Sequence, residues 1–185
     1  MKNLMPVVLL LALVVVAGGA GVAVAQDPPR LTAAGPTSVT GTDATSVFEI
    51  ADRTIRQVRY HDRGTLTYAF VLHNQGSLPV TVTGLAAQEH RPRLFRYLRV
   101  TDTSGATRFT VPAGGSRTVR LALRMTGCES LSSRAGSFVR SVDLSTARAR
   151  VLRDDVRVSL PEELHTGSPR EAFCPRSTAT SRPPG

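Results

Sequence analysis

The stretch from Val111 to Met125, VPAGGSRTVRLALRM, decides the fold of this chain. Its second half places Val119, Leu121, Leu123 and Met125 in alternation with Thr118, Arg120, Ala122 and Arg124. A period of two is typical of a β-strand that has one face on the core and the other in water. The glycines before it allow the backbone angles of a tight turn, so we expect a turn followed by a half-buried strand.

The same alternation recurs over most of the chain. We predict strands at about 47–60 (with a break near Asp52), 65–73, 78–84, 94–101, 107–111, 117–126, 137–144 and 155–160. Turn-forming residues separate these runs, and no run has the pattern of a long amphipathic helix. The sequence therefore predicts an all-β fold, a single antiparallel Ig-like β-sandwich of about seven to nine strands, with a small barrel as the alternative.

Two stretches resemble a known family. In Thr65–Leu85, TLTYAFVLHNQGSLPVTVTGL, a strand ends in Asn-x-Gly and a Pro-Val-Thr-Val strand follows. In Val111–Met125 a Pro-x-Gly-x-Ser turn opens a later strand. These features resemble bacterial extracytoplasmic Ig-like modules of the cell-adhesion-related Ig-like domain group. The resemblance implies an Ig-like sandwich outside the cytoplasm, although this domain stands as a single copy.

The first 25 residues have the pattern of a secretory signal peptide. A basic start at Lys2 precedes an apolar run, and Ala23 and Ala25 provide the small residues that signal peptidase requires. The 20 residues from Pro6 to Ala25 are also long enough for an uncleaved membrane anchor. In both cases we expect the remaining chain to be extracytoplasmic, either secreted or retained at the membrane.

Composition divides the rest of the chain into three parts. Residues 26–46 are rich in Pro, Gly, Thr and Ser and predict a flexible linker, and 47–174 form the folded domain. Residues 175–185 have almost nothing apolar and predict a disordered tail. An even pair of cysteines in an exported chain favours a disulfide between Cys128 and Cys174, which would fasten the C-terminal segment to the domain.

The chain is strongly basic, with a net charge of +9, and all its basic residues except Lys2 are arginines. A surplus of this size favours attraction to an anionic partner. The exclusion of lysine is also what a high-GC codon bias produces, and the two explanations are compatible.

The segment from Arg91 to Arg99 is the best candidate binding site. It interleaves four arginines with two aromatic residues: Arg91, Arg93, Phe95, Arg96, Tyr97 and Arg99. On a regular strand, Arg93, Phe95, Tyr97 and Arg99 would share one face, and Leu94, Arg96, Leu98 and Val100 the other. Guanidinium groups suit phosphates and carboxylates, so we expect an anionic envelope lipid or polymer; nucleic acid is not expected outside the cytoplasm. The alternative is a core strand whose arginines lie at its rims.

Catalytic and metal-binding motifs are weak throughout. Glu162 and His165 would share one face only on a helix, and Pro161–Pro169 predicts a loop. His61 and His73 are predicted surface histidines. We therefore expect no enzyme activity, metal or cofactor. The prediction is an exported, non-catalytic binding or scaffolding protein of the cell envelope, whose partner is an envelope protein or an anionic lipid or polymer.

Overall fold

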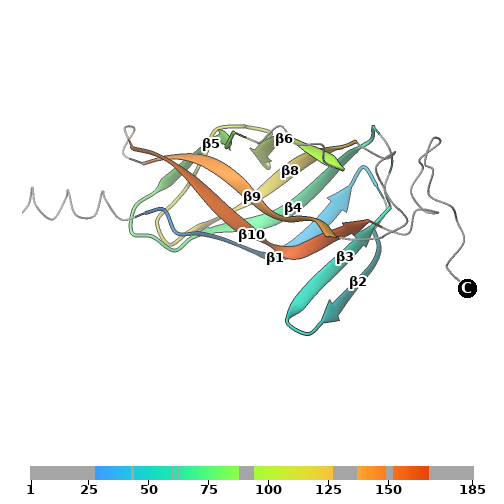
Figure 1. Cartoon of the computed structure of the whole chain (residues 1–185). Coiled ribbons are helices and arrows are strands. Elements are labelled where there is room, and N and C mark those ends of the chain that lie inside the picture. The colour runs from blue at the N-terminus through green and yellow to red at the C-terminus, as the bar shows by residue number, and fades with distance from the viewer. Residues whose placement is uncertain are drawn as a thin grey trace, which may run out of the picture.

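The computed structural model describes residues 28–42, 44–59, 61, 63–87, 94–126, 137–148 and 152–166. Ten β-strands, arranged in two sheets, and no helix are found in these ranges (Figure 1). Within the same ranges, nothing forms a helix of the length and apolarity needed to cross a membrane. The prediction of an all-β fold is confirmed for these residues.

The first sheet has four antiparallel strands. Its order is β1 (Leu31–Thr40), β4 (Thr65–Asn74), β8 (Ser116–Met125) and β6 (Phe95–Asp102). The two strands with the clearest alternation in the sequence, β4 and β8, lie side by side at its centre. Consequently β1 and β6 are its edges.

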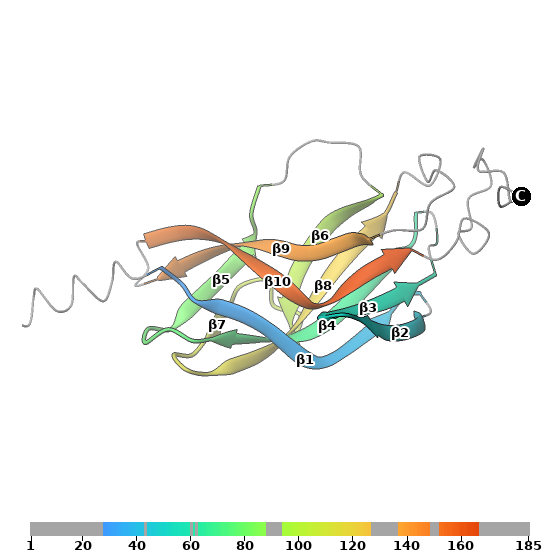
Figure 2. The same cartoon turned by 60° about the horizontal axis from the view of Figure 1, so that its bottom comes forward.

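The second sheet has six strands. Its order is β2 (Ala44–Ile50), β3 (Arg53–Val58), β10 (Leu152–Thr166), β9 (Ser137–Arg148), β5 (Val80–Leu85) and β7 (Phe109–Val111). All its pairs are antiparallel except β3 with β10, which is parallel. The β2–β3 hairpin extends from the two-layered body (Figures 1 and 2). The expectation of seven to nine antiparallel strands is corrected to ten strands with one parallel pair.

The core lies between the two sheets. On β4 the side chains of Leu66, Tyr68, Phe70 and Leu72 are all 0% exposed. They belong to one apolar cluster with Val82, Leu144 and Leu164 of the second sheet. Burying one such side chain fully stabilises the fold by about 1.5–3 kcal/mol. The alternation in the sequence of β4 therefore arises because every second side chain is buried between the two sheets.

Gly41 allows the chain to turn from β1 into β2. It has a φ of +80°, and a Cβ atom there would lie 2.1 Å from the carbonyl oxygen of Thr65. Any other residue would collide with the backbone at the start of β4. The position of the β2–β3 hairpin thus depends on a glycine.

The linker predicted over residues 26–46 is wrong for most of its length, because Leu31–Thr40 forms β1. Leu31 is buried, and Ala33 and Val39 pack against the core. The pairing with β4 shifts register between Ala34 and Ser38. Small residues and this shift hide the alternation, so the folded domain begins well before residue 47.

The loop predicted over Pro161–Pro169 is also corrected, because β10 continues to Thr166. Pro161 falls where the pairing with β9 shifts register, a place where a strand tolerates a residue without an N–H. Glu162 and Leu164 face the core. Since residues three apart on a strand face opposite sides, Glu162 and His165 do not form a metal-binding pair.

Candidate anion-binding face

Of the predicted anion-binding residues, Arg96 and Arg99 are exposed on the edge strand β6. Arg91 and Arg93 lie outside the described residues, as do Cys128, Cys174, the leader (1–25) and the tail (175–185). The disulfide and the leader therefore stay predictions.

A β-bulge changes which side chains of β6 share a face. The register with β8 shifts between Tyr97 and Arg99, so Leu98 is an extra residue on this strand. Phe95 and Tyr97 point toward the core, and both arginines point outward. The expectation that Arg99 shares a face with the aromatic rings is wrong, because it assumed a regular strand.

The two aromatic residues of β6 have structural roles. The rings of Phe95 and Tyr97 pack edge to face, with centroids 5.1 Å apart. The Tyr97 hydroxyl donates a hydrogen bond to the backbone carbonyl of Ser141 on β9 in the other sheet, at 2.5 Å. This pair connects the two layers and does not take part in an exposed binding surface.

Two arginines of β8, which lie far from β6 in the sequence, complete a basic surface with those of β6. Arg124 lies directly opposite Arg96, and Arg120 lies opposite Thr101. Nη1 of Arg120 donates a hydrogen bond to the carbonyl oxygen of Thr103 at 3.1 Å, which orients its guanidinium. We refer to Arg96, Arg99, Arg120 and Arg124 as the arginine face. Directly opposed like charges destabilise a sheet, so the pair of Arg96 and Arg124 is not explained by stability.

Hydroxyl groups line the same face. On β4, Thr65 lies opposite Arg124 and Thr67 lies opposite Ala122, and both side chains alternate with the buried ones. Thr118 of β8 is exposed on the same side. The arginine face is therefore bordered by groups that can donate and accept hydrogen bonds.

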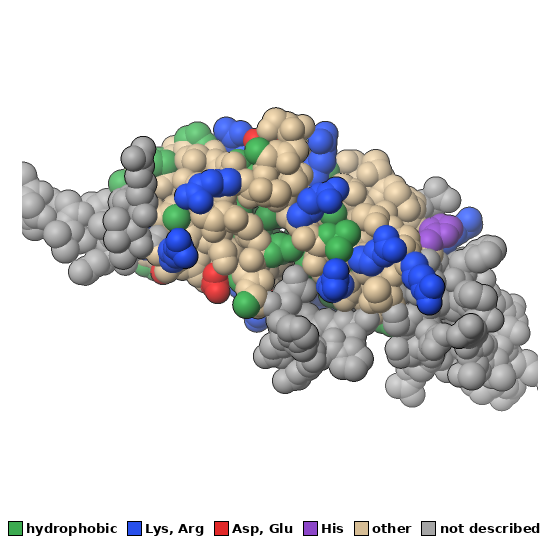
Figure 3. Space-filling model, turned by 90° about the horizontal axis from the view of Figure 1, so that it is seen from above, with side chains coloured by type: hydrophobic (Ala, Val, Ile, Leu, Met, Phe, Trp, Pro, Cys, Tyr) green, Lys and Arg blue, Asp and Glu red, His purple; other side chains and the backbone are tan. Residues whose placement is uncertain are grey.

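Among the described residues, acidic side chains are almost absent from this side of the molecule. Of the acids that the structure describes, Asp102 alone lies in the first sheet, where it is buried and paired with Arg117 at 3.0 Å. The others lie in the second sheet or at its β2–β3 turn: Glu49, Asp52, Asp143, Asp154, Asp155, Glu162 and Glu163. Figure 3 shows one side of the molecule, seen from above, on which blue side chains outnumber red ones. Among the described residues, none forms an ion pair with Arg96, Arg99 or Arg124.

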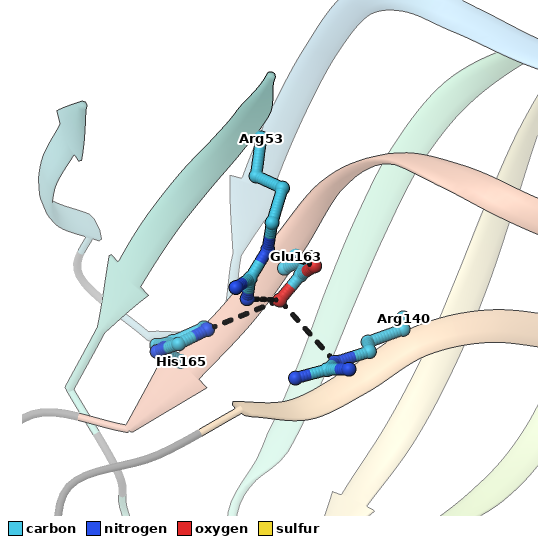
Figure 4. A network of polar contacts seen from close by, with 4 residues as sticks. All are labelled: Arg53, Arg140, Glu163 and His165. Carbon is cyan, nitrogen blue, oxygen red and sulfur yellow. Dashed lines mark hydrogen bonds and ion pairs between the residues drawn. The ribbon is translucent and has the colours of Figure 1, made fainter. Parts of the chain in front are cut away.

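A second group of charges lies on the outer side of β3, β9 and β10 (Figure 4). Arg53 donates two hydrogen bonds to the Glu163 carboxylate, one of them 2.7 Å long. Nε of Arg140 and Nε2 of His165 each lie 3.3 Å from Oε2 of Glu163. The hydrogen bonds from Arg53, followed by the contact with His165, lower the pKa of Glu163 to about 2. Because this carboxylate is already shared by three cationic or polar groups, the network connects strands and leaves little capacity for a ligand.

A buried ion pair between Glu162 of β10 and Arg56 of β3, two neighbouring strands of the second sheet, is hydrogen-bonded to side chains of the first sheet. The Glu162 carboxylate accepts hydrogen bonds from Arg56 Nε at 2.6 Å and from Thr37 Oγ1 at 2.8 Å. The Tyr68 hydroxyl donates to it from β4 at 3.2 Å. Burial opposes ionisation of Glu162, but the hydrogen bonds from Arg56 and Thr37 prevail and lower its pKa. These four side chains, from four strands, fix the packing of the layers.

No group of three or more metal-binding side chains occurs in the described part of the chain. Ser116 Oγ and His73 Nδ1 are 2.5 Å apart across β8 and β4, on the exposed side. Among the residues described, no carboxylate contacts His73. This pair lacks the third group that orients the histidine in a catalytic triad.

Comparisons with known proteins do not identify a family. No family model matches the sequence, and a search of curated proteins finds no relative. One similar solved structure is the crystal structure of the cupredoxin domain of amoB from Nitrosocaldus yellowstonii. It is 15% identical with a TM-score of 0.27, and the alignment covers 65% of this chain and 65% of that chain. A similarity of this size assigns neither a family nor a function.

Proposed function

We propose that this protein is a non-catalytic, extracytoplasmic binding module that attaches through its arginine face to an anionic polymer of the cell envelope. The observation that carries the proposal is the grouping of four arginines on one sheet face that carries none of the described acids except the buried Asp102. Guanidinium groups form paired hydrogen bonds with phosphates and carboxylates, and nearby threonine hydroxyls can add further contacts.

A polymer is favoured over a lipid bilayer because the described part of the arginine face has few exposed aromatic or large apolar side chains. Proteins that lie on membranes insert aromatic or large apolar side chains into the headgroup region. On the described part of this face the aromatic rings of β6 point inward, and Leu98 is the one exposed large apolar residue. The face can therefore form polar contacts over its area but has little to insert.

An Ig-like sandwich is the finer assignment of the fold that we propose. The order β1–β4–β8–β6 corresponds to strands A, B, E and D of that fold, and β10–β9–β5 corresponds to G, F and C. The β2–β3 hairpin is then an insertion between the first two strands. The resemblance of Thr65–Leu85 and Val111–Met125 to bacterial Ig-like modules supports the same assignment.

Binding of the full-length protein to immobilised polyphosphate and to polygalacturonate tests the function. The double variant Arg96→Ala/Arg124→Ala should weaken binding by roughly tenfold, equivalent to about 1.4 kcal/mol. Added salt should weaken wild-type binding, because exposed charges are screened. The matched control is Arg108→Ala/Arg153→Ala, which removes the same charge from exposed sites elsewhere, beside Asp154 and Asp155.

Equal losses in the two double variants would show that only net charge matters and would refute a specific face. Binding to vesicles containing phosphatidylglycerol, without binding to either polymer, would replace the polymer with a lipid surface. Retention of one envelope protein at high salt, without polymer binding, would instead favour a scaffolding role.

A further inference from the structure

Three of the four sheet edges carry features that prevent pairing with another strand. β1 contains Pro36 within a register shift, β6 has the bulge at Leu98 and two exposed arginines, and β7 is only three residues long. Such features are common on edge strands, since unpaired backbone groups otherwise bind strands of other molecules.

The fourth edge, β2, has none of these features. Its sequence ATSVFEI contains no proline, lysine or arginine, and Ser46–Ile50 pairs regularly with β3. Val47, Phe48 and Ile50 are 49%, 40% and 53% exposed. They are three of the four exposed large hydrophobic residues in the described chain. No described strand pairs with the outer edge of β2.

The hairpin is placed so that this edge is accessible. Figure 1 shows β2 and β3 extending below the two-layered body, with β2 as the outermost strand. A strand could therefore approach β2 from outside without contact between the two bodies. The occupant must be extended, because a row of backbone N–H and C=O groups is what the edge offers.

We propose that β2 pairs antiparallel with β2 of a second copy, about a two-fold axis at Val47, so that the six-stranded sheet continues through a dimer. In this register Val47 lies opposite Val47 of the second copy, and Ile50 lies opposite Ala44. The two Phe48 rings become diagonal neighbours, a distance that aromatic side chains can bridge. The two Glu49 side chains are separated by four residues along the strand, which limits their repulsion.

The same register also relates two exposed residues of opposite charge, Asp52 and Arg59. When the pairing is continued beyond β2, Asp52 at the hairpin tip comes level with Thr42 of the second copy. Thr42 Oγ1 donates a hydrogen bond to the carbonyl oxygen of Arg59, so Arg59 lies beside that position. Asp52 and Arg59 are both exposed. The two-fold axis therefore brings Asp52 of each copy toward the end of the hairpin that carries Arg59 in the other copy.

Sedimentation of the full-length protein over a wide range of concentrations tests the dimer. We expect wild type to dimerise, and Val47→Lys to remain monomeric with an unchanged circular dichroism spectrum, because it places two like charges on the axis. Leu98→Lys, which alters the other exposed apolar site, should still dimerise. Wild type that is monomeric at every concentration would overturn the proposal, and so would a Val47→Lys variant that dimerises normally.

Cysteine cross-linking tests the register. Residues on the axis have Cα atoms about 4.5–5.5 Å apart, within the range of a disulfide. Val47→Cys should therefore form an intermolecular disulfide under mild oxidation. Glu49→Cys should not, because its two copies lie far apart, and wild type provides the background from Cys128 and Cys174. Equal cross-linking at both positions, or none at Val47, would refute pairing about Val47. This test does not depend on the proposed function.

Discussion

Glu162 and Glu163 are neighbours on β10, yet alternation along the strand gives them opposite surroundings. Glu162 faces the other sheet, where its side chain is 9% exposed and that of its partner Arg56 is 14% exposed. Glu163 faces outward, and its main partner Arg53 is largely in solvent. An ion pair shielded from water is costly to break, because one charge is left buried without a partner. The two carboxylates should therefore contribute to stability in different ways.

Substitution Glu162→Gln should destabilise the protein by about 3 kcal/mol, because the buried Arg56 guanidinium loses its counter-ion. The free energy of unfolding in denaturant measures this loss. Asp143→Asn is the control, since it weakens the exposed, two-bonded pair of Asp143 with Arg157 and should destabilise the protein much less. Similar losses in the two variants would mean that Arg56 finds another partner or water in the absence of Glu162.

Glu163 should make stability depend on pH in the acid range. Its pKa in the folded state is about 2, below the ordinary value of 4.5 that it regains on unfolding. Its stabilising contribution is therefore fully present above about pH 4.5 and is lost as the pH falls toward 2. Melting temperatures of wild type and Glu163→Gln should differ most near neutral pH and converge in acid. A difference that stays constant across this range would contradict the role of the ionised carboxylate.

At the scale of elements, the sequence predicted strands well where large apolar residues alternate and poorly where they do not. The sequence pattern predicts β4 and β8, because the side chains of each strand alternate between core and solvent. The composition of β1 predicts a linker, because Ala, Gly, Pro and Thr occupy most of its positions. The end of β10 has the sequence pattern of a loop, because a register shift near Pro161 interrupts the alternation of the strand.

The candidate site was only half predictable for a related reason. Arg96 and Arg99 were found, because arginine density is a local property of the sequence. That Arg96 and Arg99 share a face could not be predicted, because a single bulge residue, Leu98, reverses the alternation of the residues that follow it. Arg120 and Arg124 join them only through the pairing of β6 with β8. Such a register joins residues far apart in sequence, and no local pattern specifies it.

At the scale of the whole molecule, the two proposed surfaces are compatible. The arginine face belongs to the four-stranded sheet and β2 to the far edge of the other sheet, so pairing through β2 leaves the arginines uncovered. A two-fold axis perpendicular to the continued sheet keeps both four-stranded sheets on the same side of it. The two arginine faces of a dimer would then point in one direction, toward the same surface.

This geometry predicts binding that depends on ligand density. On a dense polyphosphate surface, dimeric wild type should bind about tenfold or more tightly than the Val47→Lys monomer, because the second contact becomes intramolecular. For a short soluble oligophosphate, which one face can occupy alone, the two proteins should bind equally. Arg96→Ala/Arg124→Ala should lose affinity in both assays while remaining a dimer. If Val47→Lys weakened binding to the short oligomer as much as to the dense surface, β2 would belong to the binding site itself rather than linking two sites.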